Sequence, residues 1–168
     1  MNIFKLFSLV TFIAFILSGC DDNRSESHAN IALIDLPKAF TSSEIAIQEK
    51  ERVDSIIRTM QDAMDKSKKE YDKLSPEKAE EARKADAVKM GIVLEQSKHL
   101  ARLSSLKVIL EEIEKMRKEG GCSVILLRTS VVSADEQMDI TNALVQRLKG
   151  LKVDYGEMPA FTVKDTTE

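Results

Sequence analysis

Several residue types on which common folds and sites depend are scarce in this sequence. Its 168 residues include no Trp, six Gly, three Pro, two Cys and two His, and only 5% are aromatic. So few aromatic residues disfavour an aromatic-cored β-sandwich. Two Cys cannot build a disulfide framework, and two His argue against a zinc site of Cys and His ligands. A net charge of −3 argues against a nucleic-acid-binding surface. Ala, Glu, Lys and Leu are abundant, and together with Arg and Gln they favour long helices.

The apolar run at the N-terminus is too short to span a membrane. Leu6 to Ile16 is apolar over eleven residues, whereas a spanning helix needs roughly 20. A short run behind one positive charge is typical of a cleaved export signal, here over residues 1–19. Leu17-Ser18-Gly19-Cys20 follows directly and resembles the bacterial lipobox.

The lipobox resemblance implies that the chain is cut before Cys20 and that Cys20 carries lipid. Two or more acyl chains anchor a protein stably in a membrane. We therefore expect the acylated Cys20 to bind the protein to membrane lipid. Asp21 resembles the signal that retains lipoproteins at the inner membrane, which favours the periplasmic face of that membrane over the outer one. Residues 20–29 are polar behind the Cys and are typical of a flexible tether. The alternative is an ordinary secretory signal in which Cys20 is incidental.

The centre of the chain predicts a long antiparallel coiled-coil hairpin over residues 41–119. Thr41 and Glu44 have the spacing of a capping box, so a helix should begin there. Ser75-Pro76 interrupts this helix and suits the start of a second one, which Gly120-Gly121 ends. Apolar residues at alternating steps of four and three predict the seam between the helices. The predicted seam consists of Val53, Ile57, Met60, Met64, Ser67, Tyr71 and Leu74 on the first helix and Ala82, Ala85, Lys89, Ile92, Gln96, His99, Leu103, Leu106, Leu110 and Ile113 on the second.

The segments on either side of the hairpin, residues 30–40 and 120–150, predict a small β/α body. Short apolar runs rich in β-branched residues are typical of buried strands. A polar cap before an apolar face predicts a short terminal helix. Residues 151–168 show no period and are expected to form a loose C-terminal tail. The expected elements of the body are strands at Ile31–Leu36, Ser123–Arg128 and Val131–Val132 and a helix that begins at Asp139.

Short motifs around the hairpin carry a family resemblance. They are Ile31-Ala32-Leu33-Ile34-Asp35 with Lys38-Ala39-Phe40, then Gly121-Cys122-Ser123-Val124-Ile125-Leu126, Val131-Val132, Asp139-Ile140-Thr141 and Val145-Gln146-Arg147-Leu148. In this order the chain resembles the Skp (OmpH) family of periplasmic chaperones over roughly residues 30–150. The resemblance implies a mainly helical fold with a small β body. It also implies a homotrimer whose three hairpins project like tentacles around a cavity for an unfolded outer-membrane protein.

Elementary energetics favours self-association, in agreement with the trimer that the resemblance implies. A few short strands and one small helix cannot bury enough apolar surface alone. We therefore expect strand residues to contact neighbouring subunits. The candidate oligomerisation residues are Ile31, Leu33, Val124 and Leu126.

The chain departs from the family in its charge. Well-studied members are basic and soluble, whereas this hairpin carries 17 basic and 17 acidic residues between Glu44 and Glu119. This balance puts any phosphate or lipopolysaccharide site in doubt and leaves apolar contact as the expected mode of client binding. The second helix carries more apolar residues near its middle than one seam can bury. The candidate client-binding residues are Met90, Ile92 and Leu94.

The sequence therefore predicts a lipid-anchored periplasmic holdase that binds unfolded envelope proteins without ATP. The alternative is a structural coiled-coil lipoprotein of an envelope, secretion or conjugation assembly. We expect no enzyme and no cofactor, because the chain has no phosphate-binding loop, nucleophile elbow or metal-ligand cluster. His99 is interpreted as a seam residue and Cys122 as a small buried residue at a strand start.

Overall fold

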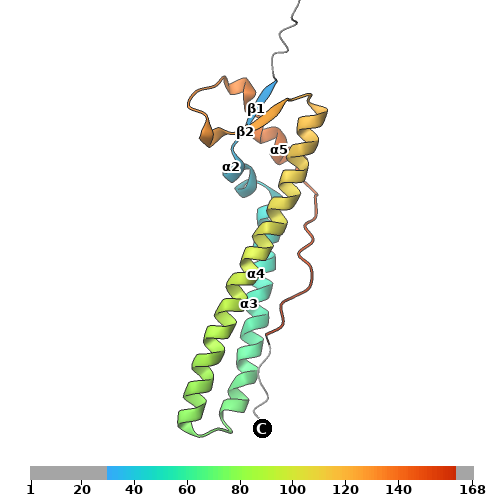
Figure 1. Cartoon of the computed structure of the whole chain (residues 1–168). Helices are drawn as coiled ribbons and strands as arrows, with labels where there is room; N and C mark the ends of the chain where they lie inside the picture. The colour runs from blue at the N-terminus through green and yellow to red at the C-terminus, as the bar shows by residue number, and fades with distance from the viewer. Residues whose placement is uncertain (1–29, 162–168) are drawn as a thin grey trace, which may run out of the picture.

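The structure is a computed structural model that describes residues 30–161. The predicted signal sequence, Cys20 and Asp21 lie outside the described residues. A long helical hairpin with a small body at its base makes up the described part (Figure 1), which confirms the predicted mainly helical fold class. The elements are β1 (Ile31–Ile34), α2 (Leu36–Thr41), α3 (Glu44–Tyr71), α4 (Pro76–Glu119), β2 (Val124–Leu127), the 3-10 turns η1 (Arg128–Ser130) and η2 (Glu136–Met138), and α5 (Thr141–Arg147).

The two hairpin helices differ in length. With 28 residues in α3 and 44 in α4, their lengths are about 42 and 66 Å at a rise of about 1.5 Å per residue. The longer α4 continues past the start of α3 into the body (Figure 1). As predicted, Ser75 precedes α4 in an extended conformation and Pro76 occupies its first turn. After α4, Gly121 has a φ of 61°, a backbone conformation that favours glycine.

The first hairpin helix begins later than the predicted residue Thr41. Thr41 instead ends α2, and its hydroxyl donates to the carbonyl oxygens of Pro37 and Lys38. Ser43 is the residue before α3, and the Glu44 carboxylate accepts from the backbone N–H of Gly150 at 3.0 Å. The capping-box prediction was therefore wrong, because its two side chains bond to other partners.

The seam between α3 and α4 is built largely from small residues. Ala63 and Ser67 of α3 and Ala101 and Ser105 of α4 are buried. The Ser67 hydroxyl donates to the Ala63 carbonyl oxygen within its own helix at 2.9 Å, so its burial leaves no donor unpaired. Small side chains allow the two helices to approach closely. Larger buried residues are Ile45, Ile56 and Ile109 nearer the base and Tyr71 and Met90 nearer the tip.

The predicted seam on α4 was wrong over much of its length. Leu103 and Leu110 are 49% and 54% exposed, and Ile92 is 55% exposed. Ser105 and Ile109 are buried instead. The apolar residues at steps of four and three do share one face of α4, but that face points away from α3. Periodicity identifies such a face without identifying what covers it.

The body contains a two-stranded parallel sheet. β1 pairs with β2 in a register that runs from Ile31 opposite Val124 to Ile34 opposite Leu127. The whole hairpin forms the crossover between these parallel strands. The predicted third strand at Val131–Val132 is absent from the described residues: η1 turns the chain away, and Val132 lies fully in solvent.

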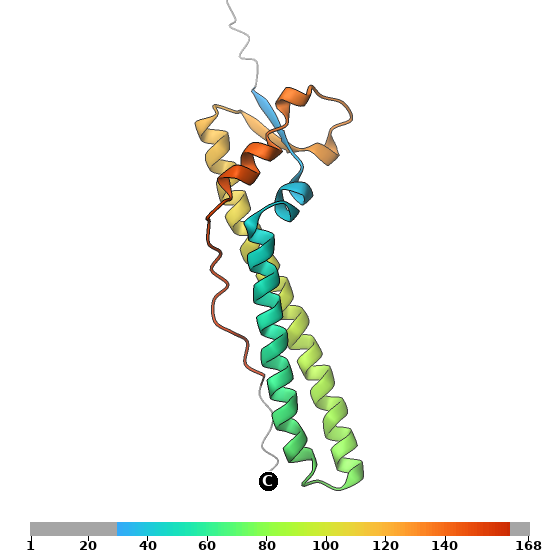
Figure 2. The ribbon, with the colours of Figure 1, turned by 180° about the vertical axis from the view of Figure 1, so that it is seen from behind.

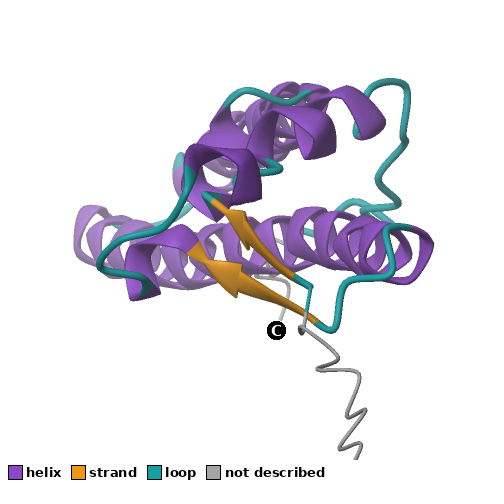
Figure 3. Cartoon of the chain, turned by 90° about the horizontal axis from the view of Figure 1, so that it is seen from above, coloured by secondary structure: helices purple, strands orange, loops and turns teal. Residues whose placement is uncertain are grey.

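A single apolar core joins the body to the base of the hairpin. Seen from above, the two strands lie side by side (Figure 3), and α2 packs against α5 in the body. The Thr141 hydroxyl accepts from the backbone N–H of Asp35 at 2.9 Å, which ties α5 to the end of β1. The helix predicted from Asp139 begins at Thr141, with the Asp139 carboxylate accepting from the Thr141 N–H at 2.9 Å. The buried core consists of Ile34, Ala39, Phe40, Ile45, Ile109, Leu144 and Leu148.

The described part of the C-terminal tail, residues 151–161, is not loose. It runs in an extended conformation along the hairpin beside α3 (Figure 2). Leu151 and Val153 pack against the core. The Tyr155 hydroxyl forms a hydrogen bond of 3.1 Å with the Ser105 hydroxyl of the seam. An extended segment has no helical period, so its sequence pattern gave no indication of this packing.

Candidate functional site

The strongest feature of the surface is an apolar face of α4 that nothing in the described chain covers. We call Ile92, Leu103, Leu106 and Leu110 the outer stripe. Leu106 is half-buried and the other three are exposed. At the base of this stripe lies a groove of about 690 Å³, lined by three of these leucines. Such a patch is typical of a contact surface for another protein.

Charged residues of both signs border this groove. The rim is formed by Lys107, Glu111, Glu114, Lys115 and Lys118. A neighbouring side chain, Arg117, binds Glu114 through two hydrogen bonds of 2.7 and 2.8 Å and holds the pKa of that carboxyl down at about 2. The groove is therefore apolar at its floor and close to neutral at its rim.

The predicted client-binding residues do not lie together. Ile92 belongs to the outer stripe, and Leu94 is half-buried. Met90 is only 5% exposed, so its assignment to an exposed client surface was wrong. It faces α3 and lines a cavity of about 290 Å³ near the tip, together with Met64 and Tyr71. The register of α4 explains the difference, because residues two positions apart face in different directions.

The predicted oligomerisation residues also separate into two groups. Leu33 is 1% exposed and packs inside the body, so it offers no contact surface to a neighbour. Leu126 is 39% exposed, Ile31 is similarly exposed and Val124 is half-buried. Within residues 30–161, the outer edge of β2 has no strand partner. This edge could accept a strand of another chain.

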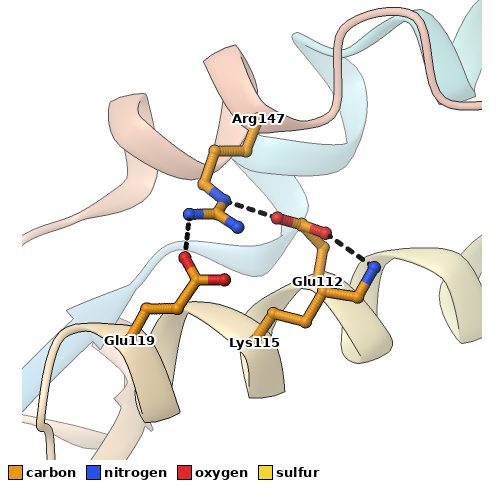
Figure 4. Close-up of polar contacts among 4 residues, drawn as sticks. All are labelled: Glu112, Lys115, Glu119 and Arg147. Atoms are coloured by element: carbon orange, nitrogen blue, oxygen red, sulfur yellow. Dashed lines mark hydrogen bonds and ion pairs between the residues drawn. The ribbon is translucent and has the colours of Figure 1, made fainter.

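An ion-pair cluster fixes the body on the hairpin (Figure 4). Arg147 of α5 binds the buried Glu112 of α4 and, at 2.6 Å, Glu119, which lies two helical turns further along α4. Lys115 pairs with the second oxygen of Glu112 at 3.3 Å. The hydrogen bond from Arg147 lowers the pKa of Glu119. Sequence reasoning missed this cluster, since only the Glu112–Lys115 spacing is visible without the fold.

A second set of polar contacts holds the C-terminal tail against α3. The Gln48 side chain donates to the Leu151 carbonyl oxygen at 2.8 Å and accepts from the Val153 N–H at 3.1 Å. Arg52 donates to the carbonyl oxygens of Tyr155 and Glu157. Burial raises the pKa of the Tyr155 hydroxyl. Sequence reasoning assigned no role to these residues.

The described residues offer little else for chemistry. Within residues 30–161, no group of three His, Cys, Asp or Glu is placed to hold a metal ion. None of the helices in this range combines the length and apolarity that crossing a membrane requires. His99, expected in the seam, is exposed, and Cys122 is a half-buried free thiol.

Comparison with known proteins gives one structural likeness. No family model and no curated protein matches the chain. It is similar to a solved crystal structure of a candidate outer membrane chaperone (OmpH-like) from Caulobacter crescentus CB15. The two share 23% sequence identity with a TM-score of 0.47, and the match covers 74% of this chain and 89% of that chain.

Proposed function

We propose that this protein is an ATP-independent holdase that binds unfolded envelope proteins, including outer-membrane β-barrel proteins, on the periplasmic side. The outer stripe of α4 carries the proposal. It presents large apolar side chains along a stiff helix, with Leu103 and Leu110 about half exposed. An unfolded chain can contact such a surface through many weak apolar contacts without adopting one structure.

Assembly of three subunits through the β body would place three hairpins around one chamber. The outer edge of β2 and the exposed side chains of Ile31 and Leu126 support a homotrimer. A two-stranded sheet is marginal alone, and pairing with strands of other subunits would extend it. Three hairpins projecting from a shared body would enclose a client between their apolar faces.

Lipid on Cys20 would hold this chamber at a membrane. The Leu17–Cys20 motif supports the anchor, and Asp21 supports retention at the inner membrane. Cys20→Ser should therefore release the protein from membranes or block its processing. A processed variant that stays membrane-bound would contradict a Cys20 anchor.

An aggregation assay tests the holdase. A urea-denatured outer-membrane β-barrel protein is diluted with or without the purified full chain, and light scattering is followed. We expect suppression at near-stoichiometric ratios. A second copy of the assay with Leu103→Ser/Leu110→Ser should show weaker suppression. Lys78→Gln, at an exposed position of α4 outside the groove, serves as the control. Unchanged scattering with the wild-type chain would reject the holdase.

A structural coiled-coil lipoprotein is the second candidate function, and the spacing of the outer stripe favours it. Leu103, Leu106 and Leu110 follow steps of three and four, the pattern by which one helix packs lengthwise on another. A scaffold would bind one defined helical partner and would leave denatured proteins to aggregate. The same scattering assay therefore separates the two candidates.

A further inference from the structure

Side chains of α3 hold the C-terminal tail by hydrogen bonds to its backbone. Gln48 uses both atoms of its amide group, one toward the Leu151 carbonyl oxygen at 2.8 Å and one toward the Val153 N–H at 3.1 Å. This is the pairing that a neighbouring β-strand would make. Such contacts recognise an extended backbone whatever its sequence.

Arg52 continues the same row of contacts one helical turn further along α3. Its guanidinium donates to the carbonyl oxygens of Tyr155 and Glu157 and lies 6.0 Å from the centre of the Tyr155 ring. Two side chains of α3 therefore hold four backbone groups of one extended segment.

The segment held in this way alternates in polarity. Leu151, Val153 and Tyr155 are partly buried against the hairpin, while Lys152 and Asp154 are exposed. Strands of membrane β-barrels alternate apolar and polar residues in the same manner, with a period of two. Residues 151–155 thus share the period of two with such strands.

The same stretch of α3 carries an acceptor that forms no hydrogen bond with the tail. Glu49, between Gln48 and Arg52 in the chain, is buried, and its Oε1 pairs with Arg102 at 3.0 Å. Its Oε2 is buried and has no hydrogen-bond partner in the described part of the chain. Buried acceptors are nearly always paired, so this atom marks a position where a different occupant could donate a bond.

We infer that the face of α3 around Gln48, Glu49 and Arg52 is a binding site for extended polypeptide of alternating polarity, and that the chain's own residues 151–157 occupy it at rest. This inference rests on the proposed function and adds, besides the outer stripe of α4, a second place on the hairpin where a client strand binds. The tail then acts as an internal competitor, and a client must displace it before this site contributes to binding.

A set of full-chain variants tests the site by client affinity. Tyr155→Ala removes the hydrogen bond to Ser105 and the inward ring, so the tail should detach more readily. We expect the affinity for a denatured β-barrel protein to rise at least threefold. Lys152→Ala, a control on the exposed side of the same segment, should leave affinity unchanged. Adding Gln48→Ala and Arg52→Ala to Tyr155→Ala should abolish the gain, whereas adding Glu51→Ala at an exposed position of α3 should not.

A peptide in trans gives a second measurement, which compares two peptides on one and the same chain. A synthetic peptide with the sequence of residues 150–161 should compete with the client on the Tyr155→Ala chain. A peptide of the same composition without alternation should compete far less. Unchanged or weaker client binding by folded Tyr155→Ala, together with equal competition by both peptides, would overturn the inference. If the wild-type chain and all variants bind no client, the proposed function fails; in that case selective binding of the alternating peptide would still support the site.

Discussion

The Tyr71 hydroxyl donates a hydrogen bond of 2.6 Å to the Asp86 carboxylate and so connects α3 to α4 close to the hairpin tip. Burial and the bond to Asp86 raise the pKa of Tyr71. The Tyr71 ring is also 5.6 Å from the guanidinium carbon of Arg83. Few large apolar side chains are buried in this region, so these polar contacts contribute much of what holds the two helices together there.

Tyr71→Phe should therefore loosen the tip without unfolding the hairpin. The loss of one hydrogen bond costs about 1 kcal/mol. Amide hydrogen exchange near residues 68–80 should become several-fold faster, while exchange near the body stays unchanged. Lys69→Gln, at an exposed position nearby, is the control. Equal acceleration along the whole hairpin would show that the tip does not open independently.

Truncation of two adjacent apolar residues of α4, Ile109 and Leu110, should destabilise the fold to very different extents. Ile109→Ala removes a fully buried side chain from the core and should cost about 2 to 5 kcal/mol of unfolding free energy. Leu110→Ala removes an exposed side chain and should cost no more than about 0.5 kcal/mol. Urea unfolding of the two variants measures both costs. A larger loss from Leu110→Ala would mean that its face, not that of Ile109, packs against α3.

The hairpin was predictable from sequence, but its contact face was not. Ser75-Pro76 and Gly120-Gly121 gave the ends of α4 correctly, because caps and breakers act locally. The seam instead depends on how closely two helices approach, and Ala101 and Ser105 determine that. A search for large apolar residues passes over such positions and selects Leu103 and Leu110, which face outward.

The candidate sites were predictable to a smaller extent. The exposed position of Leu126 agrees with its predicted contact to a neighbouring subunit. Leu33 and Met90 are buried against residues of the same chain that only the fold brings close to them. The contacts of Gln48 and Arg52 join residues more than 100 positions apart. Neither side chain differs in type or spacing from an ordinary solvated helix residue.

Asp139, in the turn before α5, should make the free energy of unfolding decrease at acidic pH. Hydrogen bonds from the side chain and the backbone N–H of Thr141 lower the pKa of Asp139 below its ordinary value of 3.8. A group with a lowered folded pKa stabilises the fold above its unfolded pKa, and this contribution is lost as pH falls through the folded pKa. Unfolding free energy should thus fall below pH 3.8, and the fall should be shallower in Asp139→Asn. Identical profiles would exclude a role for Asp139.

Substituting Asp at two leucines of the sheet should separate assembly from folding. Leu33→Asp places a carboxylate in the core, which costs several kcal/mol, on the order of 3 or more, and should unfold the body. Leu126→Asp places it on the exposed face of β2 and should dissociate the predicted trimer while disturbing the fold of each subunit less than Leu33→Asp does. Light scattering with circular dichroism measures both properties. A folded, compact wild-type monomer at micromolar concentration would contradict the trimer.

Client binding should depend little on salt. Exposed charges are screened beyond about 8 Å at physiological ionic strength, so a basic chaperone loses electrostatic capture as salt rises. This hairpin has 17 basic and 17 acidic residues and no net charge to screen. What remains is apolar contact with the outer stripe, so affinity for a denatured β-barrel protein should change less than about twofold between low and moderate salt. Leu103→Ser/Leu110→Ser should lower it several-fold at both salt concentrations. A steep loss of wild-type binding with salt would mean that local charge clusters, such as the rim around Lys107 and Glu111, hold the client instead.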